Sequence, residues 1–415
     1  MKLNSIKYTN CFNNKKFNKE YKKILDNLIP KVFNDSDLKK SKFLNQVNDK
    51  NNFQQIEKIV KKFKKNFNKF CVLGTGGSSF GSQALIGINQ KYKKDKIIFL
   101  YDIDPIYFQN TLDSLNFNKT AFIVISKSGK TPETLAQFGA IINKFEELKL
   151  KSQIKKNFLI ITEDNKNPLK ILSDKLKIKT LIHNEEIGGR FSVFSNVGLL
   201  PSALVGIDVK SFLYGGKKVL DDFYLNKNLK PIESAVIMVL MQKYFNININ
   251  VLFTYSEALK NFGIWYRQLW AESLGKKGNG ITPFHSMGTV DQHSQLQLFL
   301  DGPKDKFFTI IKSNHSNKGP IISSNSFFKS EMNYLSGKKI GDLMEAEQNA
   351  TIQTLINNNL PVKEILINKI NEESLGSLIM YCFLEVICIG KIFKVNIFDQ
   401  PAVEEGKKIA KKYLI

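Results

Sequence analysis

Short, unbroken apolar runs alternate with amphipathic stretches from residue 70 onward. The first four runs are FCVLG (70–74), KIIFLY (96–101), TAFIVIS (120–126) and NFLIIT (157–162). Apolar runs without polar alternation are typical of strands that are buried on both faces, and the amphipathic stretches between them have the character of crossover helices. The pattern therefore predicts a parallel sheet with helices packed on its faces.

A second series of the same kind begins after Pro231. We expect its strands at INVLFTY (249–255), FFTIIKS (307–313), VKEILI (362–367) and Val395–Phe398. We expect its helices at Glu233–Phe245, from Glu257 to about Ser273, from about Leu375, and at the C-terminus. The repeated pattern predicts an α/β fold with two doubly wound parallel-sheet domains of the flavodoxin-like kind.

The first part of the chain has a different composition. Residues up to about 66 are rich in Lys and Asn, and Ile24, Leu25, Leu28 and Val32 have helical spacing. The 415 residues also exceed the usual length of one domain. We therefore predict an N-terminal helical extension (1–66), a first domain (67–210) and a second domain with a C-terminal helix (211–415).

The net charge of +23 would by itself indicate a nucleic-acid partner. However, Arg190 and Arg267 are the only arginines, and the lysines are scattered among Asn and Ile throughout the chain. Specific readers of bases and phosphates favour the planar arginine fork. We attribute the charge to a compositional bias and expect no nucleic acid as partner, although the charge can attract anionic small molecules to the surface.

Cysteine usage and hydropathy bear on the compartment. The cysteines form no CxxC pair and no cluster with zinc-ligand spacing: Cys11, Cys71, Cys382 and Cys388. The N-terminus lacks the apolar core of a signal peptide, and the apolar stretch 378–393 is interrupted by Glu385 and Lys391. We expect a cytoplasmic protein with no membrane partner and no metal.

A glycine-rich segment, GTGGSSFG (74–81), follows the first predicted strand and leads into a helix. Glycines let the backbone approach an anion closely, and a helix start offers free N–H groups with a partial positive charge. Such a turn can also reverse the chain or bind a dinucleotide. The spacing here is not GxGxxG followed by an acidic strand end, which disfavours a nicotinamide site. We interpret the segment as a cradle for an anion or a sugar.

The segment ISKSGKTPET (125–134) links the third predicted strand to the next helix. Helix capping alone accounts for Thr131 and Pro132, but not for the additional hydroxyls of Ser126 and Ser128 beside a glycine. Hydroxyls, backbone amides and a helix N-terminus together favour a phosphate site. Both loops follow parallel strands, and ligands bind at the carboxyl ends of such strands.

Four longer segments complete the pattern: GGRFSVFSNVGLLPSAL (188–204), WAESLGKKGNG (270–280), GTVDQHSQLQ (288–297) and FDQPAVEEGK (398–407). Together with the two loops, which look like those of a sugar-isomerase (SIS) domain, they resemble the motifs of the glucose-6-phosphate isomerase family. The resemblance covers residues 74 to 407. It implies a cofactor-free enzyme of glycolysis and gluconeogenesis that interconverts glucose 6-phosphate and fructose 6-phosphate.

Moving a carbonyl between C1 and C2 requires a base for the transferred proton and stabilisation of the enediolate. The resemblance assigns the base to Glu272 and ring opening to His293 with help from Lys407. Histidine suits ring opening because its unperturbed pKa lies near neutral pH. Arg190 resembles the residue that stabilises the enediolate; a structural ion pair would also explain an arginine there, as we assume for Arg267.

The resemblance also implies the remaining contacts. The substrate-binding residues would be Gly77, Ser78, Ser126, Lys127, Ser128, Thr131, Glu133 and Gln400, with Ser126 to Thr131 on the phosphate. Many relatives have threonine where this chain has Lys130, which could pair with the phosphate or point to solvent. The family forms dimers with the active site at the subunit boundary, so we expect a homodimer in which the histidine comes from the neighbouring chain.

Three alternatives remain open at this point. A non-catalytic phosphosugar sensor would use the same loops but would need neither a base nor a ring-opening pair. A dual phosphoglucose/phosphomannose isomerase differs in positioning at C2 that sequence does not reveal, although DQHS and FDQPAVEEGK look more like the dedicated enzyme. A nucleic-acid-binding protein would need aromatic platforms or basic clusters, which we do not find.

Overall fold

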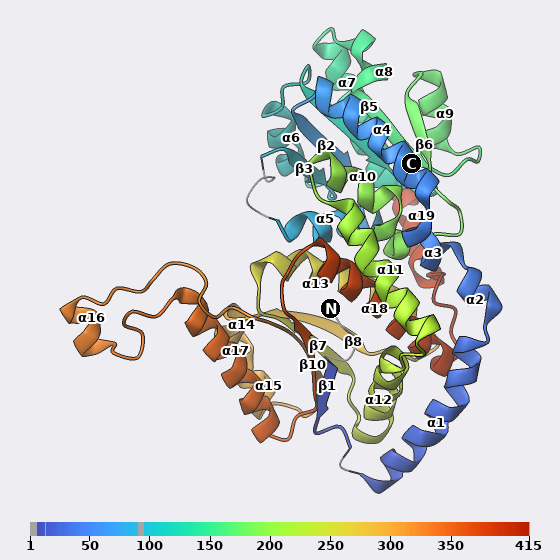
Figure 1. The fold of residues 1–415 in the computed structure, drawn as a ribbon. Coiled ribbons are helices and arrows are strands. Elements are labelled where there is room, and N and C mark those ends of the chain that lie inside the picture. Colours follow the sequence, from blue (N-terminus) through green and yellow to red (C-terminus); the bar gives the residue numbers. More distant parts are fainter. Residues whose placement is uncertain (1–5, 13, 90–94, 415) are drawn as a thin grey trace. The chain divides into compact units, whose positions relative to one another are not determined.

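The computed structural model describes residues 6–12, 14–89 and 95–414 (Figure 1). The chain divides into two compact units. One comprises residues 36–220 and 371–379, and the other comprises residues 1–35, 221–370 and 380–415. Each unit contains one five-stranded sheet. The ranges 1–66, 67–210 and 211–415 stay a prediction about domains.

The sheet of the unit containing residues 36–220 is parallel, with the strand order β3-β2-β4-β5-β6. Its strands are β2 (Lys69–Leu73), β3 (Ile97–Leu100), β4 (Thr120–Ile125), β5 (Phe158–Thr162) and β6 (Lys179–Ile182). Its helices include α2 (Ser36–Lys40), α3 (Lys42–Asn45), α4 (Lys50–Asn66), α5 (Phe80–Gly87), α6 (Pro105–Asp113), α7 (Pro132–Glu147), α8 (Ile154–Asn157), α9 (Pro168–Lys175) and α10 (Asn196–Leu204). The chain reverses its direction of winding between β2 and β4. This is the flavodoxin-like order, so the four strands predicted for the first series are confirmed.

Local sequence explains how the elements of this sheet form. Every residue of β4 is buried, as expected for a central parallel strand with helices on both faces. Phe122 of β4 stacks on Phe158 of β5 with ring centroids 5.0 Å apart. Helices α6, α7 and α9 each begin with a proline, whose fixed φ suits the first helical position. The carboxyl ends of the strands are therefore followed by well-defined helix starts.

The other unit repeats this winding with the strand order β1-β10-β9-β7-β8. Its strands are β1 (Ile6–Thr9), β7 (Ile249–Thr254), β8 (Thr282–Met287), β9 (Lys306–Ser313) and β10 (Val362–Ile367), and only β1 is antiparallel to its neighbour. Its helices include α1 (Lys15–Phe33), α12 (Lys230–Phe245), α13 (Lys260–Leu274), α14 (Val290–Ser294), α15 (Leu296–Asp301), α16 (Ser326–Glu331), α17 (Ile340–Asn357) and α19 (Glu404–Tyr413). Two further helices, α11 (Val209–Leu225) and α18 (Glu372–Phe393), have residues in both units. The helical N-terminal extension and the C-terminal helix are confirmed, whereas β1 and β8 were not predicted.

The strand predicted at Val395–Phe398 is wrong. This segment is a loop between α18 and α19. Lys394 ends the preceding helical stretch with a left-handed φ of 54°. The loop backbone is then held by hydrogen bonds to the side chain of Lys276 instead of by a neighbouring strand.

Helix α18 is long and apolar enough to span a membrane by length and composition, with a mean hydropathy of 1.8 in its most apolar window. In the structure, 89% of that window is buried. Glu385, which interrupts the apolar run, lies 2.6 Å from the Nζ atom of Lys363 on β10, and both side chains are buried. The charge in α18 is thus neutralised within the protein, as in a core helix.

Candidate active site

The predicted site residues are divided between the two units. The unit with residues 36–220 contains Gly77, Ser78, Ser126, Lys127, Ser128, Thr131, Glu133 and Arg190. The unit with residues 221–370 and 380–415 contains Glu272, His293, Gln400 and Lys407. The geometry of each group is considered separately.

The first group gathers at the carboxyl ends of β2 and β4, which are neighbours in the sheet. The 3₁₀ turn η3 (Gly76–Ser78) follows β2, and the loop 126–131 follows β4. A Cβ atom on Gly74 would lie 3.1 Å from the carbonyl oxygen of Ile125, so the two loops start side by side. This is the switch point of the winding, where doubly wound sheets bind their ligands.

The loop 126–131 gathers polar groups at the start of α7, of which Ser126 is buried. The hydroxyls of Ser126 and Thr131 lie 2.9 Å apart, and Thr131 does not use its side chain to cap α7. Gly129 has a φ of +62°, and a Cβ atom there would lie 1.7 Å from Oδ1 of Asn167. The loop therefore packs against the side chain of Asn167 at Gly129. Ser128 is exposed. Hydroxyls and helix N–H groups in this arrangement can bind a phosphate.

The two lysines of this loop differ in their surroundings. Lys127 donates from Nζ to the carbonyl oxygen of Glu185 at 2.7 Å and lies 3.6 Å from Oε1 of Glu163. Lys130 is exposed, and its backbone N–H donates to Oγ of Ser128 at 3.3 Å. The ammonium group of Lys127 is therefore held by other residues of the protein. Lys130 is the more exposed of the two lysines.

Arg190 joins the same group through the 3₁₀ segment η6 (Gly189–Phe194). A Cβ atom on Gly77 would lie 2.3 Å from the carbonyl carbon of Gly189 and 2.7 Å from the backbone nitrogen of Arg190. Ser192 also donates from Oγ to the carbonyl oxygen of Gly77 at 3.2 Å. The glycine-rich turn and the arginine segment are thus in backbone contact, and the side chain of Arg190 is only 2% exposed.

In the other unit, Glu272 and Gln400 open onto one cavity of about 500 Å³. Glu272 lies near the end of α13, is half-buried, and accepts a hydrogen bond from Nε2 of Gln268 at 3.0 Å. Gln400 precedes the 3₁₀ turn η8 (Pro401–Val403), which forms part of the cavity wall. A carboxylate at the edge of a cavity of this size can reach a bound small molecule.

Three of the four histidines form ring hydrogen bonds within their units; His183 is buried, and His285 and His315 are partly buried. Their rings hydrogen-bond as follows: His183 to Asn196, His285 to Thr254 and His315 to Ser313. Burial lowers the pKa of all three, and for His285 burial and the charge of Arg267 lower the pKa to about 4. His293, on α14, is exposed.

Within their unit, His293 and Glu272 lie at opposite ends of β8. A Cβ atom on Gly263, near the start of α13, would lie 2.3 Å from the ring of His285 on β8, and α13 then runs back toward the amino end of β8. Glu272 is nine residues further along α13, or about 14 Å of helix. His293 instead follows the carboxyl end of β8. This unit therefore does not bring the two side chains together.

Lys407 lies on α19, apart from the residues that line the cavity. Its Nζ atom pairs with Oε1 of Glu404 at 2.6 Å, and both side chains are more than half exposed. Ion pairs at such exposed positions contribute little to stability. The ammonium group of Lys407 is therefore accessible.

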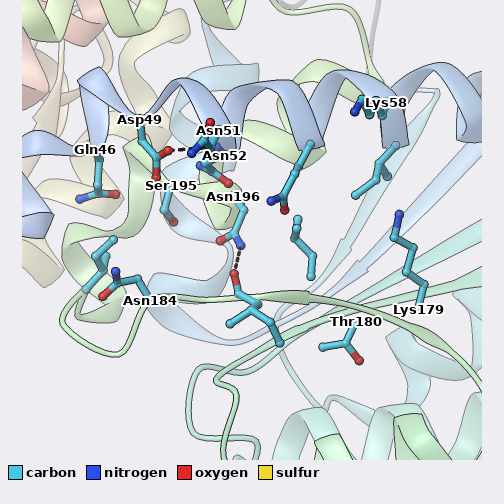
Figure 2. Close-up of a pocket in the computed structure, with 15 residues that line it drawn as sticks. Gln46, Asp49, Asn51, Asn52, Lys58, Lys179, Thr180, Asn184, Ser195 and Asn196 are labelled. Carbon is cyan, nitrogen blue, oxygen red and sulfur yellow. Dashed lines mark hydrogen bonds between the residues drawn. The ribbon is translucent and has the colours of Figure 1, made fainter.

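Another cavity, of about 580 Å³, lies between α4 and β6 (Figure 2). Most of its polar side chains are carboxamides, including Asn51, Asn52 and Asn196. Asp49 is the carboxylate residue in the lining of this cavity. Its side chain caps α4 by accepting a hydrogen bond from the backbone N–H of Asn52 at 3.0 Å. None of the predicted site residues lines this cavity. It offers no acid or base comparable to Glu272.

Fold and geometry together define a class: a doubly wound α/β protein with an anion-competent switch point in one unit and a carboxylate cavity in the other. The sequence profile of the Phosphoglucose isomerase family matches residues 39–414. The chain belongs to this family.

Individual relatives are similar in sequence to most of this chain. It is 34% identical over 414 residues to the probable glucose-6-phosphate isomerase of Methanococcus maripaludis, covering 96% of this chain and 89% of the relative. It is 35% identical over 378 residues to the glucose-6-phosphate isomerase of Campylobacter jejuni, covering 89% of each. A crystal structure of a hypothetical protein from Thermus thermophilus has a TM-score of 0.85 over 99% of both chains, at 26% identity.

Proposed function

We propose that this chain interconverts glucose 6-phosphate and fructose 6-phosphate, as the names of its relatives imply. The observation that carries the proposal is that Glu272, within the family motif, presents its carboxylate to a cavity that also contains Gln400. A half-buried carboxylate beside a sugar-sized cavity suits the transfer of a proton between adjacent carbons. The family match over residues 39–414 includes every residue in the proposed mechanism.

The substrate's phosphate binds at the switch point of β2 and β4. The hydroxyls of Ser126, Ser128 and Thr131 and the N–H groups at the start of α7 are its donors. The partial positive charge of the helix N-terminus adds to the attraction. This anchoring fixes the far end of the sugar and positions C1 and C2 for reaction.

Ring opening precedes proton transfer, because C2 becomes acidic only beside a free carbonyl. His293 donates a proton to the ring oxygen as the bond between C1 and that oxygen breaks, and the C1 hydroxyl passes its proton to solvent water as the carbonyl forms. Lys407 assists by stabilising the transferred charge. The accessible ring of His293 and the accessible ammonium of Lys407 are consistent with these roles.

Glu272 then removes the proton from C2, and the electron pair moves onto the C1 oxygen to form an enediolate. The proton of the C2 hydroxyl then moves to the C1 oxygen, Glu272 returns its proton to C1, and the carbonyl forms at C2, so that the ketose has the same atoms as the aldose. Arg190 supplies a permanent positive charge that favours the enediolate over the ground state. Glu133 and Gln400 orient the sugar and the catalytic groups.

We further propose a homodimer with shared active sites. His293 and Glu272 lie at opposite ends of β8 in one unit, so a site that uses both draws the histidine from a second copy. The segment between β9 and α17 supports such an assembly, because it projects from its sheet as an arm carrying α16 (Figure 1). Ile321 and Tyr334 on this arm are 67% and 74% exposed. Exposed apolar side chains favour burial against a partner.

The enzyme is proposed to act in the cytoplasm without a metal. Its four cysteines are buried free thiols, which fits a reducing compartment. The carboxylate of Glu272 and the guanidinium of Arg190 supply the base and the electrostatic stabilisation. A chelator should therefore leave turnover unchanged.

A coupled assay of the purified chain with fructose 6-phosphate tests the proposal. We expect turnover that EDTA does not reduce, and little turnover of mannose 6-phosphate. Binding of fructose 6-phosphate without turnover would instead identify a sensor. Comparable turnover of both sugars would identify a dual isomerase.

A further inference from the structure

We infer that Lys276 is a positioning residue that fixes the wall of the Glu272 cavity. The inference deepens the proposed function and rests on it. It concerns the link between the end of α13, which carries Glu272, and the loop 395–400, which carries Gln400. Both segments line the cavity, and they are distant in the sequence.

The contacts of the Lys276 side chain identify this link. Its Nζ atom donates to the carbonyl oxygens of Asn396 and Asp399, the latter at 2.7 Å. It also lies 2.9 Å from Oδ1 of Asp399. These three acceptors match the three donors of an ammonium group. The side chain of Lys276 is 11% exposed and that of Asp399 is 51% exposed, so the ammonium group is shielded from solvent and the carboxylate is half exposed.

The other end of the link is equally well defined. The backbone N–H of Gly275 bonds to the carbonyl of Ala271, closing the last turn of α13. Lys276 and Asn279 then exchange backbone hydrogen bonds of 3.1 and 2.9 Å. Between them, Lys277 and Gly278 have φ values of 54° and 74°, as in a type I′ turn. Lys276 is therefore rigidly placed four residues after Glu272.

The tethered loop is held by hydrogen bonds and not by a strand ladder: besides the bonds from Lys276, the side chain of Asn396 accepts from the backbone N–H of Phe398 and donates to Oδ2 of Asp399. It contains no strand, and its backbone bonds to Lys276 at two of its carbonyls. Gln400 directly follows Asp399, and η8 and α19 follow Gln400. Releasing the tether would therefore shift Gln400 and the adjacent wall relative to the carboxylate of Glu272.

This role distinguishes Lys276 from its neighbour. Lys277 occupies the turn itself, is exposed, and lines the same cavity. A substitution of Lys277 changes the charge near the cavity by the same amount without removing the tether. Lys277→Met is thus a matched control for Lys276→Met.

The test compares both variants of the full chain with fructose 6-phosphate as substrate. For Lys276→Met we expect kcat to fall roughly 10- to 100-fold, because small displacements of reacting groups are costly. The inhibition constant for inorganic phosphate should stay within about twofold, since the phosphate loops belong to the other unit. Lys277 lines the cavity, so its loss also affects kcat, but Lys277→Met keeps the tether and its kcat should exceed that of Lys276→Met by about fivefold or more. A folded Lys276→Met protein with wild-type kcat would overturn the inference.

Two further measurements keep the test decisive. Amide hydrogen exchange of residues 395–403 should accelerate in Lys276→Met and not in Lys277→Met, and unchanged exchange would overturn the inference even if the chain lacked isomerase activity. If Lys276→Met does not fold, Asp399→Asn removes the charge of one acceptor and keeps the two backbone bonds. It should lower kcat about threefold or more, and wild-type kcat in this variant would count against the tether.

Discussion

At the scale of single residues, the candidate site depends on close backbone contacts that tolerate no side chain. Gly77 packs against Gly189 and the backbone nitrogen of Arg190, and Gly129 packs against Asn167. The sequence indicated that these glycines permit close approach, but it pointed to a ligand as the approaching group. The structure shows that protein atoms also occupy that space. No pattern in the sequence identifies the partner in such a contact.

This packing predicts the effect of adding one methyl group. Gly77→Ala would push the Cβ atom into the Gly189 backbone, displacing Arg190. We expect a loss of about 1–3 kcal/mol in the free energy of unfolding and at least a tenfold loss of kcat. Gly139→Ala is the control, because a Cβ atom there would have no atom within 4 Å. In the interior of α7 it should stabilise the protein by up to about 1 kcal/mol. Denaturant titration would measure the free energy of unfolding, and the coupled assay would measure kcat. Equal changes of both quantities in the two variants would contradict the account.

His285 predicts a pH dependence of stability. Its pKa is about 4 in the folded protein because of burial, compared with roughly 6.5 for an exposed histidine. The unfolded chain therefore binds the proton more readily, and stability is lost as the pH falls from about 6.5 toward 4. His285→Gln can keep a hydrogen bond to Thr254 without the titration. Its thermal midpoint should fall less over this pH range than that of the wild type. If the thermal midpoints of the two proteins fell equally over this pH range, His285 would not contribute to the pH dependence of stability.

At the scale of secondary-structure elements, the sequence identified the central strands and the apolar edge strand β3 but missed the other three edge strands. Central strands such as β4 and β7 are buried on both faces and carry continuous apolar runs. The missed strands β1, β6 and β8 all lie at sheet edges and mix polar with apolar residues. β8 even contains Pro283, which an edge strand tolerates because one side needs no ladder hydrogen bonds. Conversely, the segment near Val395 is a loop, in which the carbonyl oxygens of Asn396 and Asp399 accept hydrogen bonds from Lys276.

The pair of β10 and α18 carries a prediction at this scale. Lys363 and Glu385 are 0% and 1% exposed and lie 2.6 Å apart, with Ser234 bonded to both. Glu385→Gln leaves a buried ammonium without its counter-charge, so we expect a loss of about 3–5 kcal/mol in the free energy of unfolding. The double variant Lys363→Met/Glu385→Leu should recover much of that loss. Chemical denaturation of the wild type, Lys363→Met, Glu385→Leu and the double variant measures the coupling, and additive effects would contradict it.

At the scale of the whole molecule, the chemistry is distributed over segments far apart in the chain. In the proposed mechanism, loops after β2 and β4 would donate to the phosphate, η6 would supply Arg190, and the end of α13 would supply Glu272. The order of the motifs predicted their membership of one site, but periodicity and spacing say nothing about which segments come from which subunit. The opposite placement of Glu272 and His293 along β8 is information that only the folded unit supplies.

A shared site predicts complementation between inactive variants. Glu272→Gln and His293→Ala should each be inactive alone. In a hybrid dimer, the glutamate of one chain meets the histidine of the other, so one of the two sites is intact. After equal, random reassortment we expect about a quarter of wild-type activity. Sedimentation would verify the dimer, and a fully active monomer would refute the arrangement.

The most direct test of the account is the turnover of fructose 6-phosphate by Glu272→Gln. The glutamine keeps the shape of the side chain and removes its ability to accept a proton. We predict that this variant folds, binds fructose 6-phosphate about as tightly as the wild type, and loses at least a thousandfold in kcat. Undiminished turnover would show that another group transfers the proton and would contradict the account.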